Sequence, residues 1–185
     1  HGTETGWILR EWLPNATGVV LVGEFCNWEE SRGHPFERSR EDGVWECRLP
    51  REALHHGDLF RLSVYWSGGR GDRIPAYANR VVQDAETHIF NAQVWAPSQP
   101  YEWKAPTPSR PPVQPLVYEA HVGIAQEKAA VGTYAEFRDQ TLPRIVQAGY
   151  NTVQLMAVME HPYYGSFGYH VSSFFAASSR FGTPE

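Results

Sequence analysis

The chain has 185 residues and a formal net charge of −5 at pH 7. This length is enough for one large or two small domains with real cores. The acidic balance, without a basic stripe, argues against a nucleic-acid partner. No apolar run approaches the about 18 residues of a membrane-spanning helix, so we expect no membrane partner.

The two cysteines, Cys26 and Cys47, show neither a CxxC motif nor zinc-ligand spacing. We therefore expect two buried free thiols in a reducing compartment, which predicts a cytoplasmic protein.

Tryptophan and proline divide the chain into parts. All seven tryptophans lie before residue 104, and half of the 14 prolines lie between residues 97 and 115. So many fixed φ angles and missing N–H donors cannot join a sheet or helix. The composition predicts a domain over residues 1–96, an extended connector over 97–115, and a second domain that begins at 116.

The first segment shows the two-residue period of strands. Trp45, Cys47 and Leu49 alternate with polar neighbours, and residues 60–66 present one apolar and one wetter face. Residues 6–13 and 18–25 flank a turn-rich tetrapeptide, which predicts a hairpin. Short strands with such turns over about 95 residues are typical of an antiparallel β-sandwich.

After the connector the period changes. Residues 116–122 predict a short strand, and 151–159 predict a strand covered on both faces, because nearly every residue is apolar. Between them, Thr133 can cap a helix and Gly149 can end it. Pro143 should kink or restart this helix. The apolar residues on one stripe of the helix are Tyr134, Phe137, Leu142, Ile145 and Val146. Strand, helix and strand with short joints predict a parallel βαβ unit.

Such a unit leaves sheet edges and apolar faces uncovered. The last residues, Thr183, Pro184 and Glu185, are typical of a helix start. We therefore expect the chain to be a fragment of a larger α/β protein.

The stretch EHPYYGSFGYH, residues 160–170 and here called the aromatic loop, follows the second predicted parallel strand. Ligands bind beyond the carboxyl ends of such strands. Aromatic faces with phenol and imidazole edges suit a sugar ring, so Tyr169 and His170 are candidate substrate-binding residues. The alternative is that these aromatics pack under neighbouring loops.

Catalytic and metal-binding patterns are weak. Glycoside chemistry with retention needs two carboxyl groups about 5–5.5 Å apart, and Glu160 and Glu119 do not form a convincing pair. His121, His161 and His170 lack the spacing of a metal site, so hydrogen bonding is expected of such a histidine. We predict no catalytic residue within the chain, no metal and no cofactor.

Two tryptophans of the first domain are candidate sugar-stacking residues. Trp28 follows an apolar strand and an Asn turn, and Trp66 ends another strand before Ser-Gly-Gly. The alternative for each is a position in the core.

The motifs of the second segment resemble a known family. LVYEAHVG and the run from TYAEFRDQ to GYHVSSFFAASSRFGTPE are similar to the start of the catalytic domain of glycogen and starch branching enzymes, in glycoside hydrolase family 13. REWLP, LVGEFCNW, DRIPAYANRVVQD and FNAQVWAP resemble the family's N-terminal carbohydrate-binding module 48. The chain departs from the family's usual pattern at EFCNW.

The resemblance implies an immunoglobulin-like β-sandwich followed by the first βαβ portion of a truncated (β/α)8 barrel. It implies cleavage of an α-1,4-glucan (glycogen, amylose or starch) and transfer to a 6-hydroxyl, in glycogen or starch biosynthesis. Tyr169 matches the family's sugar-stacking tyrosine, and His170 is adjacent to it. The family's catalytic carboxylates lie beyond residue 185, so the chain alone is expected to be inactive.

Two alternatives stay open. Amylolytic or debranching relatives share the two-domain layout. A non-catalytic glycogen-binding protein, in which the sandwich is the working part, is the alternative from another functional class.

Overall fold

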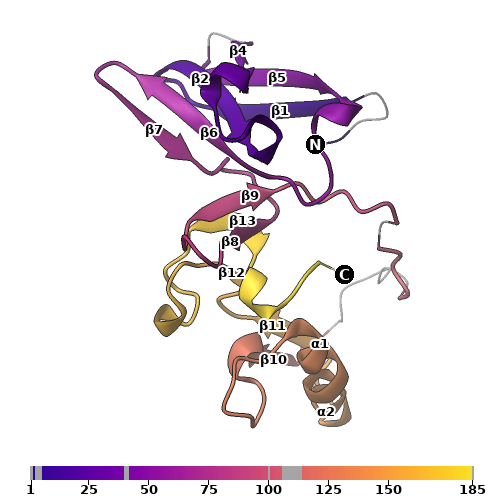
Figure 1. Ribbon diagram of the computed structural model, residues 1–185. Helices are drawn as coiled ribbons and strands as arrows, with labels where there is room; N and C mark the ends of the chain where they lie inside the picture. The colour runs from indigo at the N-terminus through magenta and orange to yellow at the C-terminus, as the bar shows by residue number, and fades with distance from the viewer. Residues whose placement is uncertain (1, 3–5, 40–41, 100, 106–113, 185) are drawn as a thin grey trace. The chain divides into compact units, whose positions relative to one another are not determined.

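The computed structural model describes residues 2, 6–39, 42–99, 101–105 and 114–184 (Figure 1). The chain divides into two compact units. Unit 1 comprises His1–Gln99 and Ser173–Ala176, and unit 2 comprises Pro100–Ser172 and Ala177–Glu185.

Parts of two sequence predictions lie outside the described residues. Residues 100 and 106–113 of the predicted connector are among them, and its described residues form neither helix nor strand. The bounds predicted for the two domains and the connector stay a prediction. Glu185 of the predicted final helix start also lies outside, and the described Thr183 and Pro184 are not helical.

Unit 1 is built from antiparallel strands in two sheets. The strands are β1 (Gly6–Trp12), β2 (Ala16–Gly23), β3 (His34–Pro35), β4 (Glu37–Arg38), β5 (Val44–Pro50), β6 (Leu59–Trp66), β7 (Gly69–Arg73), β8 (Val81–Gln83) and β9 (Phe90–Gln93). One sheet has the order β1-β5-β4, and the other has the order β3-β2-β6-β9-β8 with β7 paired to β6. Short 3₁₀ turns cover Glu24–Cys26, Glu30–Arg32 and Arg51–Ala53.

The core of unit 1 lies between the two sheets. Trp45 and Leu49 from β5 are buried in one cluster with Leu21, Leu62 and Val64 from the other sheet. Along β5, the buried Trp45, Cys47 and Leu49 alternate with more exposed residues, as the period of two predicted. Unit 1 is therefore the predicted β-sandwich.

Both cysteines of unit 1 are free and buried, as the sequence predicted, while the compartment stays a prediction. Burial raises the pKa of the Cys47 thiol to about 11, because the charged thiolate is disfavoured away from water. The structure thus shows Cys47 as a core side chain.

The predicted hairpin of residues 6–13 and 18–25 is wrong. β1 pairs with β5, whereas β2 pairs with β3 and β6 in the other sheet. The turn between β1 and β2 is held at Leu13, whose N–H donates to Gly43 O (2.9 Å) and whose carbonyl accepts from Trp45 Nε1 (3.0 Å). The turn carries the chain between sheets, so each strand turns its apolar side to the shared core.

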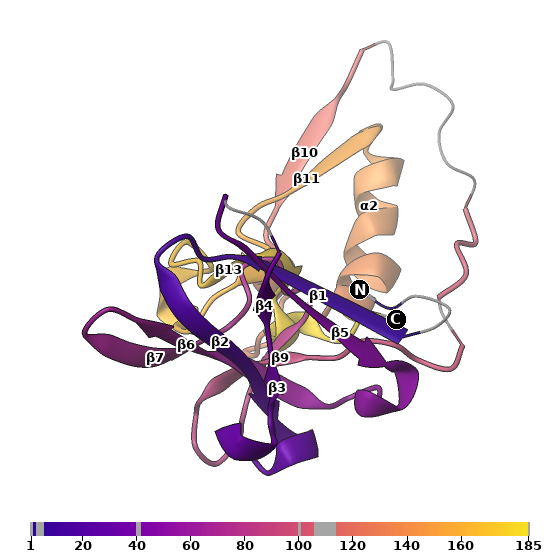
Figure 2. The same ribbon diagram turned by 90° about the horizontal axis from the view of Figure 1, so that it is seen from above.

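Unit 2 contains the predicted parallel strand–helix–strand unit. β10 (Val117–Ala120) and β11 (Thr152–Leu155) pair in parallel from Val117↔Thr152 to Ala120↔Leu155. The helical segment comprises α1 (Tyr134–Glu136), a π-helical turn (Phe137–Thr141) and α2 (Leu142–Gln147). Figure 2 shows α2 beside the β10–β11 pair.

Local signals set the bounds of this helix. The Thr133 side chain accepts from Glu136 N–H (3.1 Å), and the Glu136 carboxylate accepts from Thr133 N–H (3.0 Å), which is a capping box. Pro143 lies in the first turn of α2, directly after the π-helical turn. It cannot donate a backbone hydrogen bond, so the helix restarts there, as predicted. Gly149, with φ of +90°, ends it.

The core of unit 2 is small. Ala120, Val122, Phe137, Ile145 and Phe181 form its buried cluster. The predicted complete coverage of the second strand is wrong, since Leu155 is 40% exposed. Val146, predicted on the buried stripe, is 63% exposed, because α2 turns only its Ile145 side to this cluster.

The remaining elements are short: β12 (Met159–Glu160), β13 (Ser173–Ala177), and 3₁₀ turns at Val122–Ile124, Tyr164–Ser166 and Ser179–Phe181. None of the helices in the described residues is long and apolar enough to cross a membrane.

Candidate functional site

The aromatic loop lies at the carboxyl ends of the two parallel strands. The chain leaves β10 at Ala120, whose carbonyl accepts from Met156 N–H (3.0 Å) just after β11. Gly168 of the loop packs against Ala157, the residue after Met156, because a Cβ on Gly168 would lie 2.2 Å from the Ala157 carbonyl oxygen. In parallel α/β proteins this end of the sheet is where ligands bind.

A tight internal turn shapes the loop. Ser166 Oγ donates to the Tyr163 carbonyl (2.7 Å) and accepts from His170 N–H (3.3 Å). Phe167 and Gly168 both have left-handed φ values, +52° and +90°, and Tyr169 N–H donates to the Ser166 carbonyl (3.0 Å). Position 168 requires glycine, because it combines a positive φ with a close approach to Ala157.

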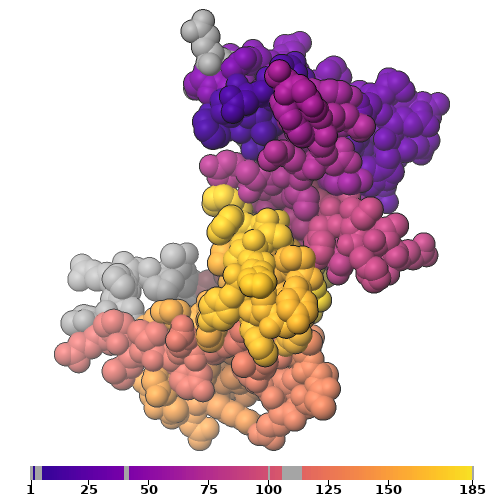
Figure 3. Space-filling view, turned by 90° about the vertical axis from the view of Figure 1, so that its left-hand side faces the viewer, coloured from indigo at the N-terminus to yellow at the C-terminus, as the bar shows by residue number. Residues whose placement is uncertain are grey.

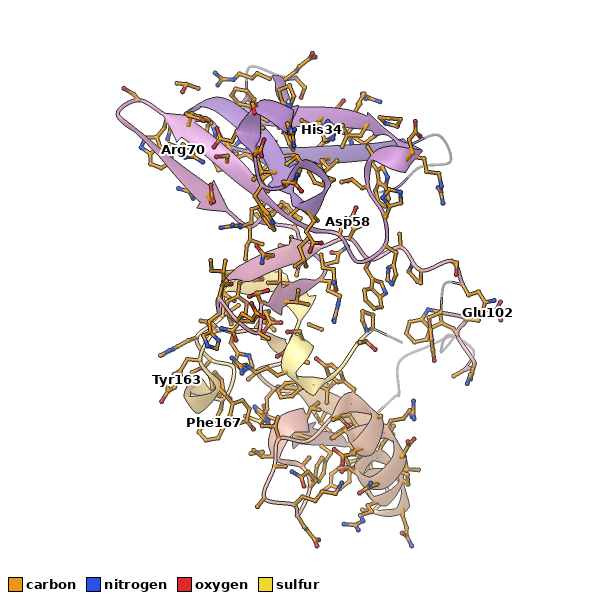
Figure 4. The ribbon with its side chains drawn as sticks, in the orientation of Figure 1. His34, Asp58, Arg70, Glu102, Tyr163 and Phe167 are labelled. Atoms are coloured by element: carbon orange, nitrogen blue, oxygen red, sulfur yellow. The ribbon has the colours of Figure 1, made fainter. Side chains whose placement is uncertain are left out.

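Most rings of the loop are exposed. Tyr163 and Tyr169 are 65% and 63% exposed, and Phe167 is 48% exposed. Figure 3 shows the C-terminal residues in space-filling form, coloured orange to yellow, and Figure 4 shows Tyr163 and Phe167 projecting from this loop. Tyr164 alone among these rings is half-buried, stacked at 6.3 Å on His161.

Exposed aromatic faces beside polar edges can take up a sugar, which has apolar C–H faces and a rim of hydroxyls. His170 is also exposed, next to Tyr169. The two loop residues predicted from the sequence, which are neighbours in the chain, are thus both exposed. Their role as substrate-binding residues stays a prediction.

Two buried histidines hold the loop. His121 Nε2 lies 2.8 Å from the Phe167 carbonyl oxygen, and His161 Nδ1 lies 3.0 Å from the Met159 carbonyl oxygen. Both contacts confirm the expectation that these histidines hydrogen-bond. The partner of His121 is 46 residues away, and no local sequence signal could have identified it.

The carboxylates near the loop are not arranged as a catalytic pair. Glu160 is fully buried, and its two oxygens accept from His161 N–H (3.1 Å) and Ser179 N–H (2.7 Å). Glu119 is exposed and accepts from the Gln154 amide (3.2 Å). Within the described ranges, no group of three or more His, Cys, Asp or Glu side chains could hold a metal ion.

In unit 1, Trp28 lies beside a polar cluster on the outer face of β6. The Arg61 guanidinium is 4.8 Å from the Trp28 ring centroid and pairs with Asp72 at 3.1 Å. Ser63, on the face of β6 that was predicted to be wetter, is buried but donates to Glu30 Oε1 (2.6 Å). This hydrogen bond and one from Tyr65 lower the pKa of the Glu30 carboxyl.

Trp66 lies on the other face of the same strand. β6 pairs with β7 without a register shift, and the one irregularity in its pairing with β2 lies between Ala16 and Gly18 of β2. Arg61 and Trp66, an odd number of residues apart on β6, therefore point to opposite faces. The Trp66 ring, 37% exposed, covers the backbone of β7, and a Cβ on Gly69 would lie 2.8 Å from its Nε1. The two predicted stacking tryptophans therefore do not form one platform.

Comparison with known proteins identifies relatives of both parts of the chain. Residues 1–78 match carbohydrate-binding module 48 (isoamylase N-terminal domain). A 1,4-alpha-glucan-branching enzyme of Rhizophagus irregularis is 46% identical over 96% of this chain and 26% of its own length. Corresponding values are 47%, 96% and 27% for that of Aspergillus oryzae, and 43%, 99% and 23% for branching enzyme 2-2 (chloroplastic/amyloplastic) of Arabidopsis thaliana.

Solved structures show the same fold at low identity. The pullulanase from Bacillus acidopullulyticus matches with a TM-score of 0.78 at 18% identity, over 99% of this chain and 25% of that one. A pullulanase of Paenibacillus barengoltzii, in complex with maltohexaose and alpha-cyclodextrin, matches with a TM-score of 0.73 at 16% identity, over 99% and 32% of the two chains.

The chain spans about a quarter of the length of the curated relatives that it matches. Over nearly its whole length it is similar to 1,4-alpha-glucan-branching enzymes, and its residues 1–78 match the carbohydrate-binding module 48 family model.

Proposed function

We propose that the complete protein is a 1,4-α-glucan branching enzyme, which cleaves an α-1,4-linked chain and transfers it to a 6-hydroxyl of another glucan. The observation that carries this proposal is the identity of 43–47% with proteins of that name over nearly the whole chain. Glycogen, amylose and starch are the substrates that fit this chemistry. The two buried thiols support a reducing location such as the cytoplasm.

We assign unit 2 to the beginning of a (β/α)8 barrel. The parallel β10–β11 pair with its connecting helix supports this assignment, as does the aromatic loop at the carboxyl ends of the strands. Retaining glycoside chemistry needs two carboxyl groups about 5–5.5 Å apart. The buried Glu160 accepts from two backbone N–H groups, which supports a structural role for it. As the family resemblance implies, we place the catalytic carboxylates in the rest of the protein and expect this chain alone to be inactive.

Within the proposed active site, Tyr169 stacks on the sugar and His170 hydrogen-bonds it. The exposure of both side chains in one turn of the aromatic loop supports these roles. They bind and orient the glucan beside carboxylates supplied from elsewhere.

The test is a branching assay on the protein encoded by the complete reading frame. Branching lowers the iodine absorbance of amylose and creates α-1,6 links that proton NMR counts. Tyr169→Ala should lower kcat/KM about ten- to a hundredfold, because the stacking surface is lost, whereas Tyr169→Phe should keep most activity. Release of reducing ends without new α-1,6 links would contradict the branching assignment.

We further propose that unit 1 binds glucan through Trp28, whose ring is half-buried beside Arg61. Affinity electrophoresis of the 185-residue chain in glycogen gels would test this, with Trp28→Ala and Trp66→Ala. Because the two rings lie on opposite faces, the effects of the two substitutions on the retardation of the chain should add without coupling. Undiminished retardation in both variants would remove the sandwich as a glucan-binding surface.

A further inference from the structure

His121 joins three parts of unit 2. It directly follows β10, its ring is buried, and it contacts the 3₁₀ turn Val122–Ile124, the aromatic loop and Phe181. The ring lies edge-on to Phe167 (6.3 Å, 81°) and to Phe181 (5.8 Å, 78°). Gly123 permits this close packing, since a Cβ there would lie 3.2 Å from His121 Cε1 and 2.8 Å from the Phe181 ring.

The hydrogen bonds of His121 fix its tautomer. Gly123 N–H donates to Nδ1 (3.1 Å), so Nδ1 is the acceptor nitrogen and carries no proton. In a neutral imidazole the other nitrogen then carries the N–H. Nε2–H therefore donates to the Phe167 carbonyl oxygen at 2.8 Å, and the ring uses both nitrogens while it is uncharged.

The carbonyl that His121 holds belongs to the left-handed turn of the loop. Phe167 has φ of +52°, and its C=O begins the peptide that leads into Gly168, at φ of +90°. Tyr169 follows directly. A non-glycine residue such as Phe167 adopts this conformation at a cost, and it persists where the surroundings hold it.

We propose that His121 is a positioning residue for Tyr169, acting through the Phe167 carbonyl. It fixes the turn that presents the Tyr169 ring at the carboxyl ends of β10 and β11. This inference rests on the proposed function, because Tyr169 is taken as the ring that stacks on the glucan. His121 itself does not touch the sugar, because its side chain is buried beneath the loop.

A matched pair of substitutions separates positioning from folding. In His121→Gln the side-chain amide reaches the place of Nε2 and can still donate to the Phe167 carbonyl. In His121→Asn the shorter amide reaches only the place of Nδ1, so it can accept from Gly123 N–H but cannot hold the loop. Both variants remove the aromatic ring equally.

The experiment measures branching kinetics on amylose with the complete protein and both variants. We expect His121→Asn to lower kcat/KM about five- to tenfold, mainly through KM, and His121→Gln to restore most of this loss. The thermal midpoints of the two variants should agree. Equal kinetics of Asn and Gln variants would overturn the inference, because a merely structural role predicts no rescue.

Two further measurements keep the outcomes distinct. If Tyr169→Ala leaves branching unchanged in the same assay, the proposed site itself fails. If Tyr169→Ala is impaired while the Asn variant matches the Gln variant, only the role of His121 fails. Should both variants misfold, ¹⁵N NMR of the histidine rings in the unsubstituted protein decides: the Nε2–H tautomer is expected at His121, and an Nδ1–H tautomer or an imidazolium at neutral pH would refute the mechanism.

Discussion

Unit 1 and unit 2 bury their apolar residues to very different degrees. In unit 1, apolar side chains from both sheets form a cluster that includes the nearly inaccessible Leu21 and Leu62. In unit 2, the strands β10 and β11 leave Val117, Tyr118 and Leu155 exposed. An antiparallel sandwich closes a core with its own residues, whereas two parallel strands and one helix cover only one side.

Different kinds of contact hold the two candidate sites in place. The Trp28 side of unit 1 rests on β6, whose long pairing with β2 is continuous except for one irregularity near Ala16. Residues 161–170 of the aromatic loop in unit 2 lie in no strand, and individual hydrogen bonds such as those to the Phe167, Pro162 and Tyr163 carbonyls hold them. A small number of hydrogen bonds therefore controls the geometry of the aromatic loop.

Producing residues 1–99 and residues 116–185 as separate proteins should show the greatest difference between the two units. Residues 1–99 should give one cooperative thermal transition by calorimetry. Residues 116–185 should show no near-UV circular dichroism and no cooperative transition, because their exposed apolar strand faces have nothing to bury against. The 185-residue chain is the control. A sharp cooperative melt of residues 116–185 would refute the contrast drawn between the two units.

Truncation of one core side chain in each unit tests how tightly each core is packed. Leu62→Ala in unit 1 should cost about 3 kcal/mol of unfolding free energy, and Ile145→Ala in unit 2 about 2 kcal/mol, since a small open cluster relaxes more easily around a cavity. Urea denaturation of the 185-residue chain measures both. Val146→Ala, at a position 63% exposed next to Ile145, is the control and should change stability by less than about 0.5 kcal/mol. A larger loss at Ile145 than at Leu62 would show that unit 2 is the tighter of the two.

The smallest effects concern pH. In unit 1, hydrogen bonds from Ser63 and then Tyr65 lower the pKa of Glu30; in unit 2, hydrogen bonds from Lys128 and then Thr133 lower the pKa of Glu136. A folded-state pKa below the unfolded value means that the stabilisation is present above about pH 4.3 and is lost as the pH falls through the folded pKa.

Glu30→Gln and Glu136→Gln should therefore each flatten the loss of stability on acidification, with the larger change in Glu30→Gln. Glutamine at position 136 can still complete the capping box with Thr133, which limits the effect there. Urea midpoints measured from pH 7 down to pH 3 test this. Unchanged acid slopes in both variants would show that neither carboxylate is linked to folding.

Local signals in the sequence were sufficient for much of the fold. Alternation predicted strands of the sandwich, Thr133 predicted where the helix starts, and Pro143 predicted where it is interrupted. The candidate loop residues Tyr169 and His170 followed from their place after the second parallel strand. Each of these signals acts over a few residues, through caps, fixed φ angles or the period of a strand.

Other features depended on residues far apart in the chain. The partners of β1 and β2, the opposite faces of Trp28 and Trp66, and the exposure of Val146 and Leu155 had no local signature. Strand partners are chosen by which apolar faces share a core, and a one-residue change of register reverses the face of every side chain.

Residue types and their spacing were enough to predict most elements of this protein, its relatives and the place of its aromatic loop. How that loop is held depends on the folded chain, because the bond from His121 to the Phe167 carbonyl spans 46 residues. The sequence does not show which group an imidazole will bond, because its partner comes within hydrogen-bonding distance only in the folded chain.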